Sequence, residues 1–317
     1  MTEMTDFFFK AATQILMVLI YIGIGFILRR SNMLPATTAK TLSVMETLVF
    51  LPALLFNNLS TNVKIDNFVN HSTTILFGAI FLVFVLLIAF LFAKIFSKGR
   101  PKDEHNTFIY IFAFANYGYF GYPLIEYVFG SEMLASMILF AVPFTFAIYT
   151  YGAYLPKGDD GSKKKITFPK NMTCILCALV LGVVVGLLNI KMPTVISQTT
   201  SALKACMSPV SMIMTGFVLG SLKFKQIFSS ARAYVVAAVR LVVIPLIFGA
   251  ALLALGAKGE LMIIPLFIAS MPIGLNVVVF TEANGRDSTD NARMCFISYI
   301  LSFITVPLIM AFLSQFQ

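Results

Sequence analysis

Ten apolar runs follow one another along the chain, each close to the ~20 residues that a helix needs to cross the ~30 Å hydrocarbon core of a bilayer. Short polar loops separate the runs. This pattern predicts an all-α membrane protein with ten transmembrane helices. The predicted spans lie near residues 7–28, 38–58, 70–96, 106–129, 132–155, 171–190, 194–221, 231–256, 260–284 and 289–314.

The composition indicates the same class of protein. Of the 317 residues, 59% are hydrophobic and 12% are charged, and the mean hydropathy is +0.90, all outside the range of ordinary soluble domains. A net charge of +9 indicates a nucleic-acid partner only where a soluble domain presents a basic face, and the sequence predicts no such domain. The expected partner is therefore the lipid bilayer. Cys174, Cys177, Cys206 and Cys295 lie in apolar runs, so we expect no disulfide framework.

Basic residues gather in the loops that follow the odd-numbered spans. The positive-inside rule places these loops in the cytoplasm and both termini outside. Glu3 and Asp6 precede the first apolar run, so we expect no cleavable signal peptide and a first span that is retained. The loops on the cytoplasmic side carry Arg29, Arg30, Lys40, Lys94, Lys98, Arg100, Lys102, Lys157, Lys163, Lys164, Lys165, Lys170, Lys223, Lys225, Arg232, Arg286 and Arg293, and the other side carries Lys10, Lys64, Lys191 and Lys258.

The chain divides into two halves around its one long polar loop, residues 157–170. We expect an N-terminal five-helix repeat at 1–156, a basic cytoplasmic linker, and a C-terminal five-helix repeat at 171–317. Because five is odd, two homologous halves must insert with opposite topology. The second and seventh spans each carry one proline, Pro52 and Pro209, in corresponding places.

The fourth and ninth spans each contain residues that weaken a helix at its centre. In the fourth, Asn116 and Tyr117 are followed by Gly118, Gly121 and Pro123. In the ninth, the run is Pro272-Ile273-Gly274-Leu275-Asn276. Glycine and proline lower helix propensity, and broken helices inside a bilayer occur where protein or a water-filled cavity satisfies the freed peptide groups. We expect both spans to break and to cross near the midplane, as in secondary carriers.

The two breaks form the predicted substrate site. Asn116 and Asn276 lie near the membrane centre, and a neutral amide offers donors and an acceptor to a carboxylate without a fixed charge. The alternative is that each asparagine caps a helix end. Tyr119 and Tyr122 either line the cavity or pack between helices. The site set comprises Asn116, Tyr117, Gly121, Pro123, Pro272, Asn276 and Arg240.

Arg240 lies about ten residues into the eighth span, too deep to reach water easily. It either binds a substrate carboxylate or partners a helix carbonyl or a glutamate. Glu46, six residues before Pro52, and Lys204, five before Pro209, occupy near-equivalent places in the two halves. We predict that they pair across the repeat interface, as a coupling or gating pair with these prolines or as a permanently buried structural pair.

The remaining ionisable groups and motifs indicate neither a metal site nor an enzyme. Glu126 and Glu282 lie nearer to helix ends and are expected to be solvated. His71 and His105 have no acidic or thiol neighbours in the sequence, so no metal site is predicted. The sequence lacks G-x-S-x-G, H-E-x-x-H and Walker motifs, which disfavours an intramembrane hydrolase or an ATP-driven pump. A channel or a receptor remains an alternative to a transporter.

Several motifs resemble the auxin efflux carrier family over essentially the whole chain. They are Asn116 followed by Gly121 and Pro123, Leu51-Pro52-Ala53-Leu54-Leu55-Phe56, Pro272-Ile273-Gly274-Leu275-Asn276, Glu282-Ala283-Asn284-Gly285-Arg286-Asp287 and Phe303-Ile304-Thr305-Val306-Pro307-Leu308. The resemblance implies the ten-helix inverted-repeat fold with crossing fourth and ninth helices. It also implies that the anion's carboxylate lies near Asn116. Where plant members carry a second proline in the ninth helix this chain has Asn276, which suits a more hydrophilic substrate than auxin.

The short central loop resembles the bacterial branch of that family, which includes malate and malonate permeases. The resemblance therefore implies a secondary active transporter of a small organic anion, most similar to a malate permease, in the bacterial cytoplasmic membrane. The alternatives are an anion channel, and a carrier for another weak acid such as an auxin-like or malonate-like carboxylate. No cofactor is expected, H⁺ or Na⁺ is a possible coupling ion, and the apolar outer surface permits a homodimer.

Overall fold

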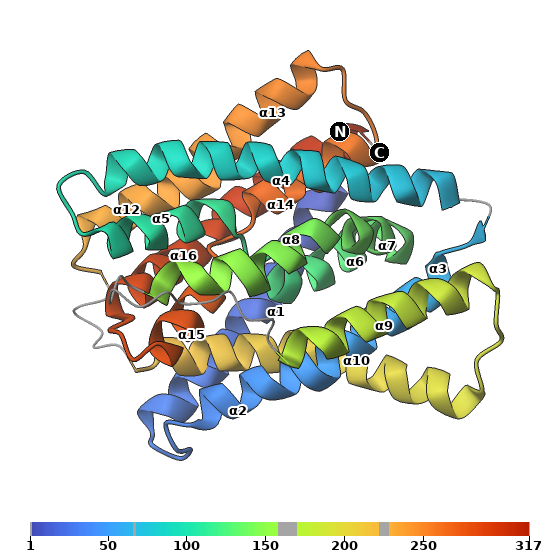
Figure 1. Cartoon of the computed structure of the whole chain (residues 1–317), viewed down its shortest axis with the longest axis horizontal. Helices are drawn as coiled ribbons and strands as arrows, with labels where there is room; N and C mark the ends of the chain where they lie inside the picture. The colour runs from blue at the N-terminus through green and yellow to red at the C-terminus, as the bar shows by residue number, and fades with distance from the viewer. Residues whose placement is uncertain (1, 66–67, 158–169, 222–227, 317) are drawn as a thin grey trace.

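The computed structural model describes residues 2–65, 68–157, 170–221 and 228–316, and every regular element within these ranges is a helix (Figure 1). The helices run mostly along the long axis of the molecule, and their connections gather at its two ends. The last turn of the described chain packs against the first helix, so both ends of the chain lie at the same end of the molecule. The predicted linker falls at 158–169, outside the described residues.

The first half of the chain consists of short and long helices in close succession. Three π-helical turns, η1, η3 and η4, and one 3₁₀ turn, η5, lie among the α-helices. In order they are α1 (Thr2–Arg30), α2 (Thr38–Met45), η1 (Glu46–Phe50), α3 (Leu51–Asn62), α4 (Phe68–Phe96), α5 (Lys102–Ala113), η3 (Tyr117–Gly121), α6 (Tyr122–Phe129), α7 (Ser131–Phe140), α8 (Val142–Ala147), η4 (Ile148–Gly152) and η5 (Leu155–Lys157).

The second half follows a similar plan, with one π-helical turn, η6, and a terminal 3₁₀ turn, η7. Its elements are α9 (Lys170–Leu187), α10 (Thr194–Leu219), α12 (Ala231–Ala238), η6 (Val239–Val243), α13 (Ile244–Ala254), α14 (Glu260–Ser270), α15 (Asn276–Ala283), α16 (Thr289–Leu313) and η7 (Ser314–Phe316).

Six helices in the described ranges are long and apolar enough to cross a membrane, and a bent pair, Ser131–Phe140 with Val142–Gly152, would add a seventh. The other predicted spans are interrupted or shorter. The fourth span is divided between α5 and α6, the ninth between α14 and α15, and the apolar part of α9 covers only Met172–Leu187. The structure thus has the helices of a multi-pass membrane protein, and the number of ten spans stays a prediction.

Three prolines follow π-helical turns rather than breaking a helix. Pro52, Pro123 and Pro245 each lie in the first turn of the α-helix that follows η1, η3 and η6. In an α-helix a proline ring clashes with the carbonyl group of residue i−4, whereas a widened π-helical turn gives this group room. Pro123 is therefore accommodated, and the break in the fourth span lies nearer its start. Pro209 lies inside α10, which continues through it.

Two groups of helices account for the packing. The first helix group contains α1, α2, α3, α9 and α10, and the second contains α4 to α8 and α12 to α16. In the first group α1 crosses α10 at Gly25 and Gly216, where an added Cβ would lie 1.9 Å from the carbonyl oxygen of Ile213 and Ile22, respectively. Glycine at both positions lets the two backbones touch, as small residues do in membrane helix pairs. Contacts of α1 with α6 and α16 join the two groups.

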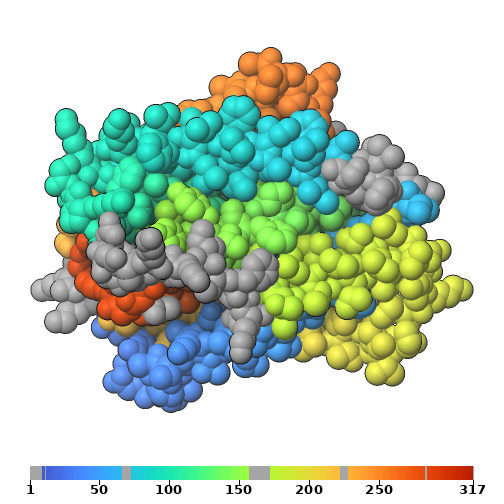
Figure 2. Space-filling view, in the orientation of Figure 1, coloured from blue at the N-terminus to red at the C-terminus, as the bar shows by residue number. Residues whose placement is uncertain are grey.

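The outer surface is strongly apolar. Along α4, which forms a band across the upper part of the face in Figure 2, the exposed side chains include Phe77, Phe84, Leu87 and Phe90. A continuous exposed apolar band of this kind marks contact with lipid. At one end of the molecule, ion pairs join the first turn of α5 to other elements. Arg286, in the loop after α15, pairs with Asp103, and Arg232 of α12 lies 3.1 Å from Glu104.

Candidate functional site

The two helix breaks meet in the interior and complete each other's hydrogen bonding. Ala115 and Ile273 form an antiparallel backbone bridge. The Asn116 N–H donates to the Pro272 carbonyl oxygen at 2.8 Å, and the Gly274 N–H donates to the Phe114 carbonyl oxygen at 3.0 Å. Peptide groups that leave a helix inside a bilayer need such partners, because no water is available to them. Each break therefore requires the other.

Local sequence explains why the chain can cross here. Met271 precedes Pro272 and is extended, at φ −71° and ψ 150°, as a residue before proline prefers to be. Gly274 passes so close to the first break that an added Cβ would lie 2.9 Å from the Phe114 carbonyl oxygen. A side chain at Gly274 would push the two breaks apart.

Asn116 uses both polar atoms of its side chain within the protein. Its Oδ1 accepts a hydrogen bond from the Tyr119 N–H at 3.3 Å, which caps η3. Its Nδ2 donates to the hydroxyl oxygen of Tyr299 in α16. Asn116 borders the cavity described below and is 4% exposed. It is thus a helix cap at the edge of a cavity, which joins the two roles that the sequence left open.

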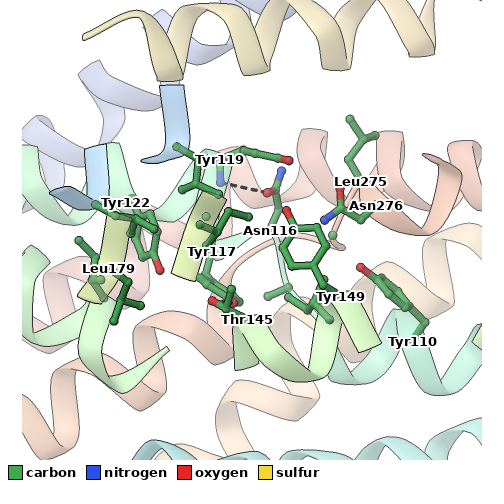
Figure 3. Close-up of a pocket in the computed structure, with 18 residues that line it drawn as sticks. Tyr110, Asn116, Tyr117, Tyr119, Tyr122, Thr145, Tyr149, Leu179, Leu275 and Asn276 are labelled. Carbon is green, nitrogen blue, oxygen red and sulfur yellow. Dashed lines mark hydrogen bonds between the residues drawn. The ribbon is translucent and has the colours of Figure 1, made fainter. Parts of the chain in front are cut away.

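Asn276 lies at the corresponding break but does not cap its helix. It is the first residue of α15, and Leu275, which precedes this helix, makes no side-chain capping bond. The Asn276 side chain is half-buried and borders the same cavity. Figure 3 shows Asn116 and Asn276 on either side of the Tyr149 ring.

A cavity of about 50 Å³ lies where the breaks meet. A bound water needs roughly 10–15 Å³, so a few waters fit, whereas ligand pockets usually measure ~300 Å³ or more. Of the described residues that line it, none is charged. The polar side chains come from four segments and are Tyr110, Asn116, Tyr117, Tyr119, Tyr122, Thr145, Tyr149 and Asn276.

Two helix N-termini border this cavity, one starting at Tyr117 and the other at Asn276. The first N–H groups of a helix have no acceptor within the helix and carry a partial positive charge, equivalent to about half an elementary charge per helix. The cavity is therefore suited to an anion without holding a cationic side chain.

The predicted site residues divide into two sets. Asn116, Tyr117 and Asn276 line the cavity, and Gly121, Pro123, Pro272 and Arg240 do not. A Cβ on Gly121 would lie 3.2 Å from the Phe267 ring, so this glycine permits close packing. Pro272 contributes its carbonyl oxygen to the bond with Asn116. Pro123 lines a separate groove of about 550 Å³ that also includes Glu126 and Lys204.

Arg240 supports a helix end and does not reach the cavity lining. It lies in η6, is 2% exposed, and donates from Nη1 to the Ala269 carbonyl oxygen at 2.5 Å. Ala269 is in the last turn of α14, immediately before the second break. A cation at a helix C-terminus satisfies a free carbonyl group and interacts favourably with the helix dipole. Of the two arrangements the sequence allowed, the structure contains the partnership with a helix carbonyl.

The expected pair between Glu46 and Lys204 does not form in this structure. The Lys204 ammonium group pairs with Glu126 of α6. Glu46 lies in η1, is 0% exposed, and has no hydrogen-bond partner for either carboxyl oxygen in the described part of the chain. The prediction rested on the spacing of Glu46 and Lys204 from Pro52 and Pro209, which places both residues at a similar depth in the membrane. Depth alone does not specify which face of its helix a residue occupies. Glu126 is accordingly ion-paired, and Glu282 is exposed and accepts a hydrogen bond from Ser288.

Sequence reasoning missed four residues that shape the site, one of them Tyr110 of α5, which lines the cavity. Thr145 and Tyr149 come from the bent fifth span, and Thr145 lies 3.2 Å from the Tyr117 hydroxyl. Tyr299 holds Asn116 from the last helix. Their only sequence signal is a hydroxyl group inside an apolar run, which many packed helices share.

Known proteins support an assignment to a family. The sequence matches the membrane transport protein family over residues 10–173 and 162–310. It is similar to an uncharacterized transporter of Methanothermobacter thermautotrophicus, at 28% identity over 95% of this chain and 98% of the relative. It is also similar to an uncharacterized transporter of Methanocaldococcus jannaschii, at 28% identity over 66% of this chain and 70% of the relative. Together with the apolar helices and the crossed breaks, these matches show that the chain belongs to the membrane transport protein family and is a multi-pass membrane transporter rather than an enzyme.

Proposed function

We propose that this protein is a secondary active transporter that carries a small organic anion across the bacterial cytoplasmic membrane. The observation that carries the proposal is the cavity between the two breaks, where two helix N-termini and the Asn116 and Asn276 amides meet with no charged lining residue among those described. Half-helix N-termini that point at an anionic group near the midplane are a feature of transporters with inverted repeats.

The helix packing supports ten spans arranged as two inverted repeats, 1–156 and 171–317. The first helix group takes the first two predicted spans of each half: α1 with α2–α3, and α9 with α10. The second takes the last three of each half, including both breaks. Each half thus contributes the corresponding spans to each helix group, as expected if the two halves have the same fold. Five spans per half then give opposite insertion, and the basic loops place both termini outside.

The size of the cavity supports alternating access. At about 50 Å³ it is smaller than a ligand pocket and represents a closed arrangement of the site. We infer that the second helix group moves against the first, by an elevator or rocking motion, to open the cavity to each side in turn. The groove around Pro123, Glu126 and Lys204 lies between α6 of the second group and α10 of the first, where such a motion would act.

The substrate is proposed to bind through one carboxylate at the helix N-termini. The two partial charges together amount to about one elementary charge, which balances a single carboxylate and releases it more readily than a fixed cation would. Malate is the first candidate because the sequence resembles malate permeases. Other weak acids, including malonate-like and auxin-like carboxylates, offer the same group. Arg240 would add positive charge for a dianion only if it left the Ala269 carbonyl group.

Uptake of labelled malate into proteoliposomes that contain the purified protein tests this proposal. Saturable uptake and counterflow are expected in the wild type, and Asn276→Ala is expected to raise KM about tenfold, the effect of losing ~1.4 kcal/mol of binding. Asn57→Ala is the matched control, because this half-buried amide bonds Thr200 away from the cavity.

Two outcomes would contradict the assignment. Full retention of uptake in both Asn116→Ala and Asn276→Ala would overturn the proposed site. Malate flux that does not saturate and shows no counterflow would indicate an anion channel. If no malate enters under any imposed gradient, the same assay with monocarboxylates determines whether another weak acid is the substrate.

A further inference from the structure

A groove of about 550 Å³ lies between the two helix groups. One side is formed by α1, α3 and α10 of the first group, and the other by α6 of the second. Polar side chains line it, among them Gln14, Glu126, Ser201, Lys204 and Ser208. Because polar and ionic side chains are costly against lipid, we expect water to fill the groove. Its volume is in the range of ligand sites, ~300–1,000 Å³.

The groove lies toward the end of the molecule that holds both chain termini. Helices α1 and α10 start at this end, on the right in Figure 1. Gln14 and Lys204 lie in the first halves of these two helices, and Glu126 lies in the last turn of α6. The proposed orientation of the chain places this end outside the cell.

Helices α3 and α6 form a wall that the groove shares with the cavity. Leu51 and Leu55 of α3 and Tyr122 of α6 line the cavity, whereas the neighbouring Leu54 and Pro123 line the groove. Helix α3 belongs to the first group and α6 to the second. Movement of the second group away from the first would therefore part this wall and connect the groove with the cavity.

Polar contacts between the two groups close this end in the present arrangement. Lys204 of α10 pairs with Glu126 of α6. At the same end, the Asn58 Nδ2 of α3 donates to the Ser131 carbonyl oxygen of α7 at 3.3 Å, and the Ser131 hydroxyl donates to the Asn62 Oδ1 at 3.3 Å. These contacts must break before the groups can separate here.

Separation of the groups would leave Lys204 without its counter-ion. Lys204 stays with the first group, whereas Glu126 moves with the second. The ammonium group would then lie in a groove open to water, with up to three hydrogen bonds to donate. Since no described residue that lines the cavity is charged, the open groove would offer an anion the fixed positive charge that the cavity lining lacks.

We propose that the groove is the outer entrance to the substrate site and that Lys204 is a transient binding site for the carboxylate of the anion, a step that rests on the transport function proposed above. In the closed arrangement Glu126 occupies Lys204. When α6 moves away from α10, the substrate carboxylate takes the place of Glu126 and then passes between α3 and α6 to the helix N-termini. Partly exposed ion pairs contribute little stability, so this exchange of one carboxylate for another costs little.

The first experiment tests the groove and needs no substrate. Ser201 is exposed and lines the groove, so Ser201→Cys places one thiol there when the four native cysteines are replaced by alanine. In intact bacterial cells that express this variant, we expect membrane-impermeant thiol reagents added outside to label the thiol. Adding Glu126→Gln should favour an anionic reagent over a cationic one, and adding Lys204→Gln instead should reverse the preference.

Two outcomes of the labelling would overturn the proposal, whether or not the protein transports malate. A thiol that is labelled only in permeabilised cells, or not at all, would mean that the groove is not open to the outside. The same reagent preference with Glu126→Gln as with Lys204→Gln would mean that Lys204 does not set the charge that an entering anion meets.

The second experiment measures malate uptake into right-side-out membrane vesicles, at malate concentrations far below KM. Glu126→Gln, Lys204→Gln and the double variant all break the ion pair, so any effect of the pair itself is common to the three. The two variants without Lys204 are expected to take up malate about fivefold more slowly than Glu126→Gln, the effect of losing one partly exposed ion pair with the carboxylate. Lys191→Gln is the matched control, because it removes an exposed lysine at the same end that does not line the groove.

The comparison of the three variants separates a binding role of Lys204 from a structural one. Equal uptake by all three would show that the ion pair is only structural and would overturn the proposal. Lys204→Arg keeps the charge and the pair, and its uptake should match the wild type; thermal midpoints of the purified variants exclude a folding defect. An absence of malate flux in the wild type would contradict the proposed substrate, and the labelling result would then decide whether Lys204 lies at an outer entrance.

Discussion

The two helix breaks occupy corresponding places in the two halves of the chain, yet they are held in different ways. At the first break Asn116 caps η3 and donates a hydrogen bond to Tyr299. At the second break the Ile273 N–H donates to the Ser298 hydroxyl at 3.2 Å, and Asn276 has no capping role. Asn116 caps the first break from within its own segment, whereas Ser298 and Arg240, from other helices, satisfy backbone groups at the second break, and Asn276 faces the cavity beside Tyr149.

Adjacent residues of α16 account for both arrangements. Tyr299 supports the first break and Ser298 the second. The last helix thereby fixes the position of each break relative to the other. In the first segment the asparagine caps a helix, and in the second it faces the cavity without capping. Variants at matched positions can separate these roles.

The largest effect is expected from Gly274→Ala. An added Cβ would lie 2.9 Å from the Phe114 carbonyl oxygen, a backbone atom that cannot move without disturbing the first break. We expect the free energy of unfolding to fall by about 3 kcal/mol, the cost of overpacking plus strained backbone hydrogen bonds. Thermal unfolding of the purified protein in detergent measures this loss, and malate uptake should be abolished.

Gly118→Ala is the matched control at the first break. A Cβ at this position meets nothing within 4 Å, and alanine favours a helix over glycine. The thermal midpoint should stay the same or rise. Equal destabilisation by the two substitutions would mean that close approach at Gly274 does not hold the breaks together.

The next largest effect is expected from Asn116→Ala. This change removes the cap of η3 and leaves the buried Tyr299 hydroxyl without its donor, so we expect a loss of about 2 kcal/mol in unfolding free energy. Tyr299→Phe should lose a part of the same energy. Because the two residues share one hydrogen bond, the double variant should be less destabilised than the sum of the single variants. Strict additivity in thermal unfolding would argue against this bond.

The two helix breaks were only partly predictable from the sequence. Glycine, proline and asparagine within apolar runs predicted two interrupted helices, because these residues change the local cost of a helix. The exact place of the first break was not predictable from Pro123. A π-helical turn accommodates that proline, and the hydrogen bonds that stabilise the break come from Pro272 and Gly274, which are distant in sequence.

The sequence predicted those site residues that can be recognised from their immediate neighbours in the chain. Asn116 and Asn276 were identified by being amides beside helix breaks, and the structure places both at the cavity. The partners of Glu46, Lys204 and Arg240 were not determined by the sequence, because hydropathy specifies depth in the membrane and not which neighbouring helix a side chain faces. Lys204 pairs with Glu126, and Arg240 with a carbonyl group.

A smaller effect is expected from Ser298→Ala. The substitution leaves the buried Ile273 N–H without an acceptor, which should lower the unfolding free energy by about 1 kcal/mol. Ser302→Ala is the matched control, since the Ser302 hydroxyl bonds the Tyr299 carbonyl oxygen within the same helix. If thermal unfolding shows the same midpoint for both variants, Ser298 does not support the second break.

The smallest effect is expected at Arg240, although it is a buried cation beside the second break. Arg240→Met removes the donor to the Ala269 carbonyl group but also removes an unpaired buried charge, so the two contributions largely offset and unfolding free energy should change by less than about 1 kcal/mol. Because Arg240 does not line the cavity, KM for malate should stay within about twofold of the wild type, less than the tenfold that 1.4 kcal/mol of binding would give.

Arg240→Lys completes this test, because it keeps the charge while changing the geometry of the donor. If Arg240 only supports the end of α14, the lysine and methionine variants should have the same KM. A tenfold rise in KM for Arg240→Met that Arg240→Lys reverses would show that the cation binds the substrate in another arrangement of the helices. The second break would then supply a fixed charge in addition to the Asn276 amide, and a dianion such as malate would be favoured over a monocarboxylate.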